Sequence, residues 1–336
     1  MRRTCSPEFA SLLLVAALVA WAASVEAEAE PLVTEAEAEP FVTGAEAEPP
    51  NSFAGAELSA DELLEALATS RSRQFKPIGR TSVLFRMRTE SRVTAGFKVE
   101  SHASHHGYRC EIAAYRVSRL LGLDTVPPTV FRQATRREIK SRFHKEKTGR
   151  WKEVANATVW RDNGVVDGAA SFWIKSPKRR LSSKRGAWQP WLRVDMPIPD
   201  GSTELARDLS SMIVFDFLVA NWDRYSGGNL LMSPGGDRAI LIDHDAAFSR
   251  LNEPLYRRLL DELMRTERFS AALVERLTAL DAEAIEAELA EDPGHAAEPL
   301  LNDAQIAALL DRRQTVLSHV AALIDEHGSD RVLFFP

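Results

Sequence analysis

Alternating apolar and polar positions predict strands early in the globular part of the chain. Val83, Phe85 and Met87 are alternating apolar positions after a turn around Gly79, and residues 93–101 form another strand-like segment. Side chains on a strand alternate between its two faces, so each such segment would bury one side. Further strands are expected at 126–132, where two prolines favour an edge position, and at 167–174 and 239–242.

Apolar positions three and four residues apart predict helices around these strands. Ser59 and Glu62 form a capping-box pattern at the start of one helix, and Asn302 and Gln305 form another near the C-terminus. A third helix is apolar on most sides, which favours a buried position. The expected helices are 58–70, 108–121, 205–220 (the apolar one), one that starts at Ser270, and 302–328.

The order of these elements predicts an α+β fold with two lobes. A smaller β-rich lobe with one prominent helix would span residues 58–172, and a larger, mainly helical lobe would span 173–336. A chain of 336 residues is long enough to give each lobe its own core. Residues 167–174 would connect the two lobes.

The first residues form the pattern of an export signal. Arg2 and Arg3 precede an apolar stretch at 12–23, and Val-Glu-Ala at 25–27 fits a cleavage site, which predicts a cleaved signal over residues 1–27. An uncleaved anchor helix is the alternative. No later apolar run reaches 18 residues, so no further membrane span is expected.

Loss of the signal would remove Cys5 and leave Cys110 as the remaining cysteine. One thiol cannot form an intrachain disulfide, so stability would come from packing. A bacterial periplasmic or secreted setting suits such a chain.

A repeat follows the signal. Residues 26–50 contain a nine-residue acidic unit, EAEAEPLVT, then EAEAEPFVT, then a truncated copy. Such a sequence cannot bury a core, so 28–57 is expected to be a disordered linker. A docking tail for a partner is the functional alternative.

Composition and charge limit the partners. Apolar residues make up 45% of the chain and charged residues 27%, as in globular proteins, and the net charge is −6. That charge argues against a general nucleic-acid binder. Two basic segments, 136–152 and 175–185, are expected to be solvated loops, with an anion-facing surface as the alternative. The protein is expected to be a monomer.

The candidate chemistry is concentrated between residues 211 and 248. A buried helix ends just before Asp223 and Arg224, a glycine pair leads to Asn229, and a strand delivers Asp243. Phosphoryl transfer from a metal-bound nucleotide requires side chains of these types in this order. Asp223 would position the acceptor hydroxyl, and Asn229 and Asp243 would hold Mg²⁺ or Mn²⁺, which prefer hard oxygen ligands.

Four neighbouring residues have other predicted roles. Asp245 is an alternate or second metal ligand, and His244 is expected to pack or hydrogen-bond rather than bind metal. Asp216, inside the apolar helix, is expected to be a hydrogen-bonded structural carboxylate. Arg224 would organise the loop through its planar guanidinium group.

Upstream residues complete a nucleotide site. Gly79, Arg80, Thr81 and Ser82 would form a phosphate-covering turn. Lys98 would contact the phosphates and Glu111, thirteen residues later, would hold Lys98 by an ion pair. On spacing alone, two unrelated surface charges remain the alternative for this pair.

These motifs resemble those of the secretory-pathway kinases, the Golgi casein kinase and four-jointed group. NWDRYSGGN with LIDHDAAF is similar to that family's catalytic and metal loops, and EIAAYRVSRLLGLDTVPPTVFR is similar to its αC-helix block. Phosphoinositide kinases and HipA-type kinases are more remotely similar. The resemblance implies a bilobal kinase-like fold, ATP, a divalent metal, and transfer to a hydroxyl of a protein or glycan.

The chain also departs from that pattern. Asp223 and Asn229 are six residues apart, where related loops usually have five, and the phosphate-covering turn has a single glycine. Three hypotheses therefore stand: an exported ATP-dependent kinase, a pseudokinase or kinase-fold scaffold without transfer activity, and an unrelated α/β protein with a chance motif.

Overall fold

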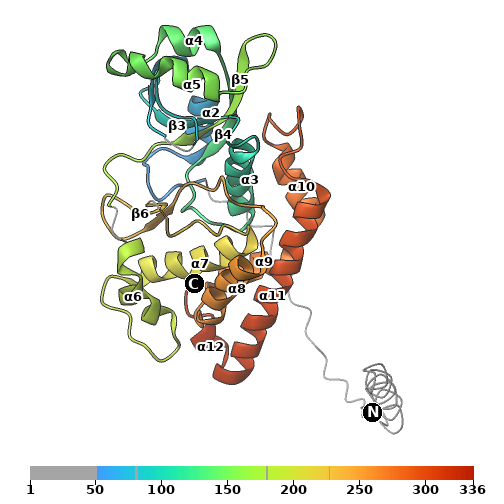
Figure 1. The fold of residues 1–336 in the computed structure, drawn as a ribbon. Helices are drawn as coiled ribbons and strands as arrows, with labels where there is room; N and C mark the ends of the chain where they lie inside the picture. The colour runs from blue at the N-terminus through green and yellow to red at the C-terminus, as the bar shows by residue number, and fades with distance from the viewer. Residues whose placement is uncertain (1–50, 80–81, 179–180, 227) are drawn as a thin grey trace, which may run out of the picture. The chain divides into compact units, whose positions relative to one another are not determined.

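The computed structural model describes residues 51–79, 82–178, 181–226 and 228–336. The predicted export signal, most of the predicted linker, and the predicted nucleotide-binding residues Arg80 and Thr81 lie outside these ranges. A five-stranded antiparallel sheet occupies the first half of the described chain, and most of the helices follow it (Figure 1). Its spatial order is β1-β2-β3-β5-β4. The strands are β1 (Ser72–Pro77), β2 (Leu84–Thr89), β3 (Thr94–Val99), β4 (Thr129–Thr135) and β5 (Val165–Phe172).

One face of this sheet carries an aromatic core. Phe75, Phe85 and Phe97 from three neighbouring strands are buried, with ring centroids of Phe75 and Phe85 5.7 Å apart. Burial of one such side chain contributes roughly 1.5–3 kcal/mol. The predicted alternation is confirmed, because Val83, Phe85 and Met87 are all buried. Leu63 of α2 (Ala60–Thr69) belongs to the same core.

The basic segment 136–152 is helical over most of its length, so its prediction as a loop was wrong. It contains α4 (Arg136–Ser141), the 3-10 helix η2 (Lys145–Arg150) and the start of α5 (Trp151–Ala157). Ile139 and Phe143 are buried against the aromatic core. These few apolar residues anchor the segment, and the many basic residues between them hid the pattern.

The helix α3 (Gly107–Leu120) links the sheet to the helical half (Figure 1). Ile112 and Val117 of α3 share a core with Phe215 of α7 and with Ala169 of β5. The next residue of β5, Ala170, belongs to the aromatic core on the other face. Strand alternation thus lets β5 serve both cores.

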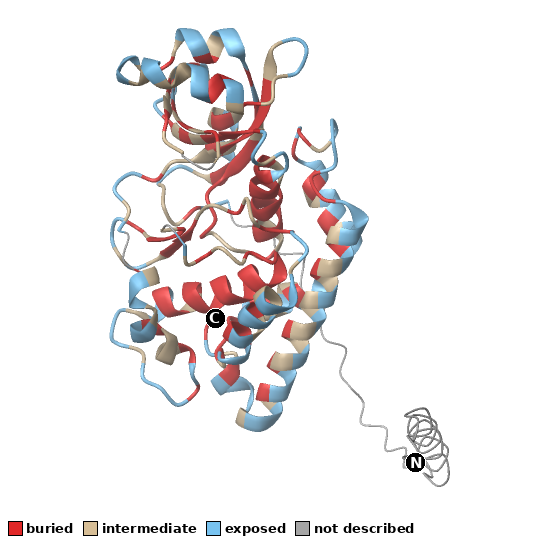
Figure 2. Cartoon of the chain, viewed as in Figure 1, coloured by how far each residue is buried: buried red, intermediate tan, exposed pale blue. Residues whose placement is uncertain are grey.

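The helical half is built around α7 (Thr203–Leu218), which is buried along nearly its whole length (Figure 2). The predicted apolar helix at 205–220 is therefore confirmed. A two-stranded sheet, β6 (Leu230–Met232) and β7 (Ala239–Leu241), follows it. The remaining elements are η3 (Ser182–Lys184), α6 (Arg185–Trp188), η4 (Gln189–Leu192), α8 (Glu253–Met264), α9 (Ala271–Ala279), α10 (Ala282–Ala290), α11 (Asp303–His327) and α12 (Ser329–Val332).

Helix boundaries follow the predicted caps. Ser59 and Glu62 form a complete capping box on α2, and Asn302 and Gln305 form one on α11. Ser270 caps α9 through its side chain. Among the described residues, no helix combines the length and apolar content that crossing a bilayer requires.

Candidate active site

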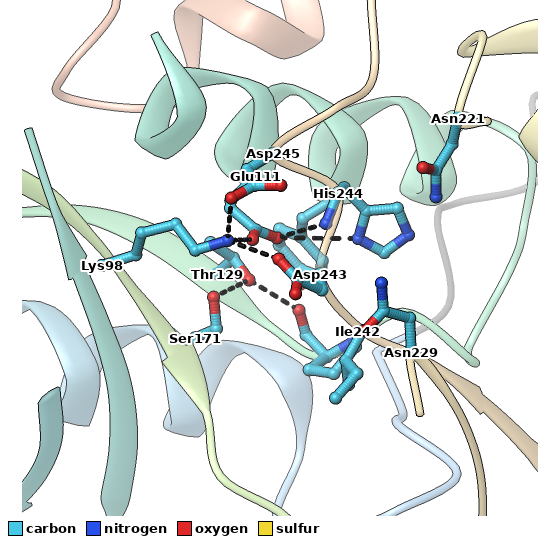
Figure 3. A network of polar contacts seen from close by, with 12 residues as sticks. Lys98, Glu111, Thr129, Ser171, Asn221, Asn229, Ile242, Asp243, His244 and Asp245 are labelled. Atoms are coloured by element: carbon cyan, nitrogen blue, oxygen red, sulfur yellow. Dashed lines mark hydrogen bonds and ion pairs between the residues drawn. The ribbon is translucent and has the colours of Figure 1, made fainter. Parts of the chain in front are cut away.

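Lys98 lies near the end of β3 and contacts three carboxylates from distant parts of the chain (Figure 3). Its Nζ atom is 2.5 Å from Glu111 Oε1, 2.5 Å from Asp243 Oδ1 and 2.8 Å from Asp245 Oδ2. The Lys98 and Glu111 side chains are only 7% and 8% exposed, so salt screens their attraction weakly. The fold thus brings together four predicted site residues that are up to 147 positions apart.

Burial and charge act in opposite directions on this cluster. Burial alone lowers the pKa of Lys98, but the carboxylates, led by Glu111, outweigh burial and raise that pKa. Burial raises the pKa of Glu111, and the Lys98 ammonium outweighs burial and lowers it. Enclosure raises the pKa of Asp243 against the attraction of Lys98, and the neighbouring carboxylates add to the rise. One ammonium faces three carboxylates, which leaves an excess of negative charge.

The short β6–β7 pair places Asn229 beside Asp243. Leu230 pairs with Leu241, and the Ile242 amide donates to the Asn229 carbonyl at 3.0 Å. Asn229 and Asp243 flank these pairs, so both side chains lie at the same end of the hairpin (Figure 3). Asp243 has φ +62°, a left-handed conformation that costs energy in a residue with a Cβ.

Asp223 and Asn229 contact each other across the loop that joins them. The Asn229 side-chain amide donates to the Asp223 carbonyl at 3.1 Å and to Asp223 Oδ2 at 3.4 Å. Asn229 is buried and Asp223 is partly exposed. Since the amide nitrogen is directed to Asp223, the amide oxygen is the atom left to face a cation. The extra residue in this loop therefore still leaves Asn229 next to both aspartates.

Arg224 holds the loop and the hairpin together from the inside. Its guanidinium group is buried and donates to both oxygens of Asp216, each at 2.8 Å. It also donates to the carbonyls of Asn229 at 2.8 Å and Ile242 at 2.7 Å. The first carbonyl belongs to the candidate metal ligand Asn229, and the second belongs to the residue before the candidate ligand Asp243. Arg224 therefore positions the backbone on which those ligands stand.

His244 completes this buried group, with its Nδ1 atom 3.7 Å from Glu111 Oε2. Its Nε2 atom lies 2.9 Å from Arg224, and its ring packs edge-on against Phe215 with centroids 5.7 Å apart. Its backbone amide donates to Glu111 Oε2 at 3.0 Å. Glu111 thus binds Lys98 with one oxygen and the Asp243–Asp245 loop with the other, which links α3 to that loop.

The turn that leads into β2 ends beside Lys98, because Leu84 pairs with Lys98 across β2 and β3. A Cβ on Gly79 would lie 2.3 Å from the Ser82 carbonyl oxygen, so this turn has no room for a side chain there. Arg150 donates to the Gly79 carbonyl at 3.1 Å. The turn is thus fastened at one end to the segment that precedes α5.

The donor set fits a divalent cation that also binds phosphate oxygens. Within the described ranges no three acidic, histidine or cysteine side chains already form a metal cluster. Proteins commonly hold Mg²⁺ through one or two carboxylates and complete its shell with substrate phosphates. Asp243, Asp245 and the Asn229 amide oxygen would be the protein ligands, and the excess negative charge favours a cation.

The charged residues that brace α3 from outside the site have no signal in the sequence. Arg116 on α3 contacts Glu288 at 3.3 Å and the buried Asp292 at 3.7 Å. Arg119 contacts Glu288 at 3.4 Å. These contacts join α3 to α10, more than 170 residues later. Charged residues on a helix normally face solvent, so only the fold identifies them as partners.

A search among known proteins finds a relative of this chain by sequence. No model of a known protein family matches the chain. The human protein glycosaminoglycan xylosylkinase is 24% identical over 272 residues, which is 70% of this chain and 64% of that protein. The chain thus spans less than two thirds of the length of this curated relative.

Solved structures show the fold. The Golgi casein kinase with Mn/ADP bound superposes with a TM-score of 0.61 and 18% identity, over 82% of this chain and 78% of that one. The structure of hydra Fam20 with sugar gives a TM-score of 0.61 and 19% identity, over 82% of this chain and 92% of that one.

The sheet, the linking helix and the helical half define a bilobal kinase-like α+β fold. The resemblance of this chain to the secretory-pathway kinase family, the Golgi casein kinase and Fam20 group, is confirmed.

Proposed function

We propose that the protein is an ATP-dependent kinase that transfers the γ-phosphoryl group to a hydroxyl of a protein or glycan. One observation carries the proposal: the buried Lys98–Glu111 pair meets Asp243 and Asp245 at 2.5–2.8 Å, with Asn229 on the same hairpin. Phosphoryl transfer depends on positioning and on charge stabilisation, and this cluster offers both. The relatives named above support the same reaction class.

The proposed step uses three groups of this chain. Lys98 would bind phosphate oxygens of ATP while Glu111 holds its ammonium in place. Asp223 would accept the hydrogen bond of the acceptor hydroxyl and orient its oxygen towards the γ-phosphorus. That oxygen forms the new P–O bond, the bond to the β–γ bridging oxygen breaks, ADP leaves, and the hydroxyl proton passes to Asp223.

A divalent cation, Mg²⁺ or Mn²⁺, would neutralise the negative charge that the phosphates bring into the site. Asp243, Asn229 and Asp245 are its proposed ligands. The relative crystallised with Mn/ADP supports this choice of nucleotide and metal. Arg224 would hold in place the backbone that carries these ligands.

We also propose lobe boundaries and a cellular location for the protein. The lobes are assigned to residues 58–172 and 173–336, with the connection at 167–174, since the five-stranded sheet ends at Phe172. The N-terminal signal pattern and the kinship with Golgi kinases support an extracytoplasmic location. The protein is proposed to act as a monomer.

The first prediction tests the metal ligand. Asp243→Ala should abolish stabilisation by Mn-ATP or Mg-ATP in a thermal-shift assay and lower phosphate transfer by at least about 100-fold, because a bound metal supplies several kcal/mol of charge stabilisation. Asp243→Asn, which keeps the side-chain shape, should behave alike. Asp261→Ala, an exposed aspartate on α8, is the control and should change neither. Wild-type transfer by either Asp243 variant would contradict the proposal.

A further inference from the structure

A second charged feature lies on the sheet, separate from the Lys98 cluster. A groove of about 760 Å³ is lined by five cationic side chains and by no acidic residue. Hydroxyl and amide groups, one indole ring and the side chain of Val93 complete its lining. The cationic residues are Arg73, Arg86, Arg88, Arg92 and Lys175. We refer to this feature as the cationic groove.

The strand register fixes the position of the cationic groove. Arg86 lies opposite Gly96 and Arg88 lies opposite Thr94, across β2 and β3. Gly96 and Thr94 share a sheet face with Lys98, because alternate residues of a strand point the same way. The groove therefore lies on the Lys98 face of the sheet, displaced along the strands towards Trp173, just after β5.

The charges of the cationic groove are not neutralised within the described part of the chain. None of its five cationic side chains forms an ion pair with a described residue. Elsewhere the structure pairs its arginines readily, as Arg142 with Glu138 and Arg150 with Glu153. In a chain of net charge −6, five unpaired cations in one groove make a local field that attracts anions.

Trp173 indicates what kind of anion fits. Its ring lies against Gly96, where an added Cβ would be 3.6 Å from the indole, and Arg86 lies over it at 5.9 Å from the centroid. The side chain remains partly exposed at the groove. The exposed part of the indole, beside Arg86, can contact the C–H groups of a sugar ring, while the guanidinium groups bind carboxylate or sulfate groups in pairs of hydrogen bonds.

The sheet edge argues against an extended peptide. Peptides commonly bind a sheet by adding a strand to its open edge, through backbone hydrogen bonds. The outer edge of β1 is already used at Phe75, whose amide donates to the Arg142 carbonyl at 2.9 Å and whose carbonyl accepts from the His144 amide at 2.8 Å. Side chains, not backbone groups, are therefore what this region offers.

We propose that the cationic groove binds an anionic polysaccharide, a chain of sugars that carries carboxylate or sulfate groups. The groove would tether the protein to such a chain and raise the local concentration of any acceptor attached to it. The inference goes beyond the proposed function and does not depend on it, because binding here requires neither ATP nor the Lys98 cluster.

The test measures binding of a fluorescent heparin octasaccharide to the full-length protein by anisotropy. Arg73→Ser with Arg88→Ser should weaken binding by about 10-fold or more, since each removes a charged hydrogen-bonding group. Both side chains are exposed, so the variant should fold normally. The matched control, Arg137→Ser with Lys140→Ser, removes two exposed cations from α4 and should leave the affinity within about twofold, because rim charges far from a site contribute little.

Two further measurements distinguish a sugar-binding site from nonspecific electrostatic attraction of anions. Trp173→Ala should weaken octasaccharide binding by several fold but leave binding of polyglutamate unchanged. Polyglutamate represents any acidic protein segment, including the Glu-rich repeat of residues 26–50. The proposal is overturned if the octasaccharide does not bind, if both double variants weaken it equally, or if polyglutamate binds as tightly and responds equally to Trp173→Ala. Transfer activity, assayed separately with Asp243→Ala, reports on the proposed function alone.

Discussion

Asn229 illustrates how much one residue depends on its neighbours. Its backbone carbonyl accepts hydrogen bonds from Arg224 and from the Ile242 amide, and its side-chain nitrogen is directed to Asp223. Only the side-chain oxygen is left for a cation. Spacing alone left the assignment of Asn229 in doubt, because the sequence does not show these three contacts.

We therefore predict a graded response at residue 229. Asn229→Ala should raise the metal concentration needed for half-maximal transfer by about 10-fold or more, because a ligand oxygen is lost. Asn229→Asp should retain much of the wild-type metal dependence, since a carboxylate also supplies a hard oxygen. The measurement is a Mn²⁺ titration of transfer activity. Equal metal dependence in the alanine variant and the wild type would exclude Asn229 as a ligand.

Cys110 gives a residue-scale prediction that is independent of metal. The thiol is buried within α3, and burial, reinforced by the Glu111 charge, raises its pKa to about 12. Its reactive thiolate is thus rare at pH 8, on the order of one molecule in ten thousand. In a Cys5→Ser variant, a thiol reagent should react slowly with the folded protein, and the rate should rise with pH towards 12 until the protein unfolds.

Unfolding in urea at pH 8 provides the comparison for Cys110. The thiol should then react at the rate of an ordinary exposed cysteine, because both burial and the nearby charge are lost. Rapid reaction of the folded Cys5→Ser protein at pH 8 would show that α3 opens far more often than its packing suggests.

At the scale of elements, Arg224 connects α7, the loop that joins Asp223 to Asn229, and the β6–β7 hairpin. Its partners come from α7 and from the residues that flank the β6–β7 hairpin, and its guanidinium group reaches all of them only because it is planar and forked. Asp216, the predicted structural carboxylate, is buried and accepts two of these bonds. The apolar helix therefore contains a charge because that charge fixes the loop beyond the helix.

Replacement of this one group should disturb the whole loop. Arg224→Lys should lower the free energy of unfolding by about 2–4 kcal/mol, because buried acceptors lose their donors and the ion pair loses its bidentate geometry. Thermal and urea unfolding would measure it. Arg257→Lys is the control, since Arg257 is 73% exposed on α8 and its pair with Glu253 should contribute little. Similar small effects of both substitutions would contradict this role.

At the scale of the whole molecule, α3 is held from both sides. Its Glu111 side chain reaches Lys98 on the sheet and the Asp243–Asp245 loop, while Arg116 and Arg119 reach Glu288 on α10. The C-terminal helices thus fix the helix that in turn positions Lys98. Site geometry and the stability of the helical half should therefore be coupled.

Glu288 offers the test of this coupling. Glu288→Ala should destabilise the protein by about 1–3 kcal/mol, because two largely buried arginines lose a partner. It should also lower transfer activity, although Glu288 lies outside the proposed site. Glu286→Ala, an exposed glutamate on the same helix, should change neither quantity. Unfolding curves and transfer rates of the two variants, measured together, decide the matter.

The sequence by itself determined the local features. Periodicity and caps located the main strands and helices, since Ser59, Ser270 and Asn302 act within a few residues of themselves. The order of Lys98, Glu111, Asp223 and Asp243 predicted the reaction class, because phosphoryl transfer needs these side-chain types together. The helices between residues 136 and 157 were missed where basic residues masked a few apolar anchors.

Only the tertiary structure decided the rest. Three features depend on residues that are far apart in the sequence. They are the contact of Lys98 with three carboxylates, the contacts between α3 and α10, and the position of five cations in the cationic groove. Local pattern carries no information on such distances. The sequence does not distinguish a charged residue that faces water from one that forms an ion pair. Only the fold shows which of the two applies.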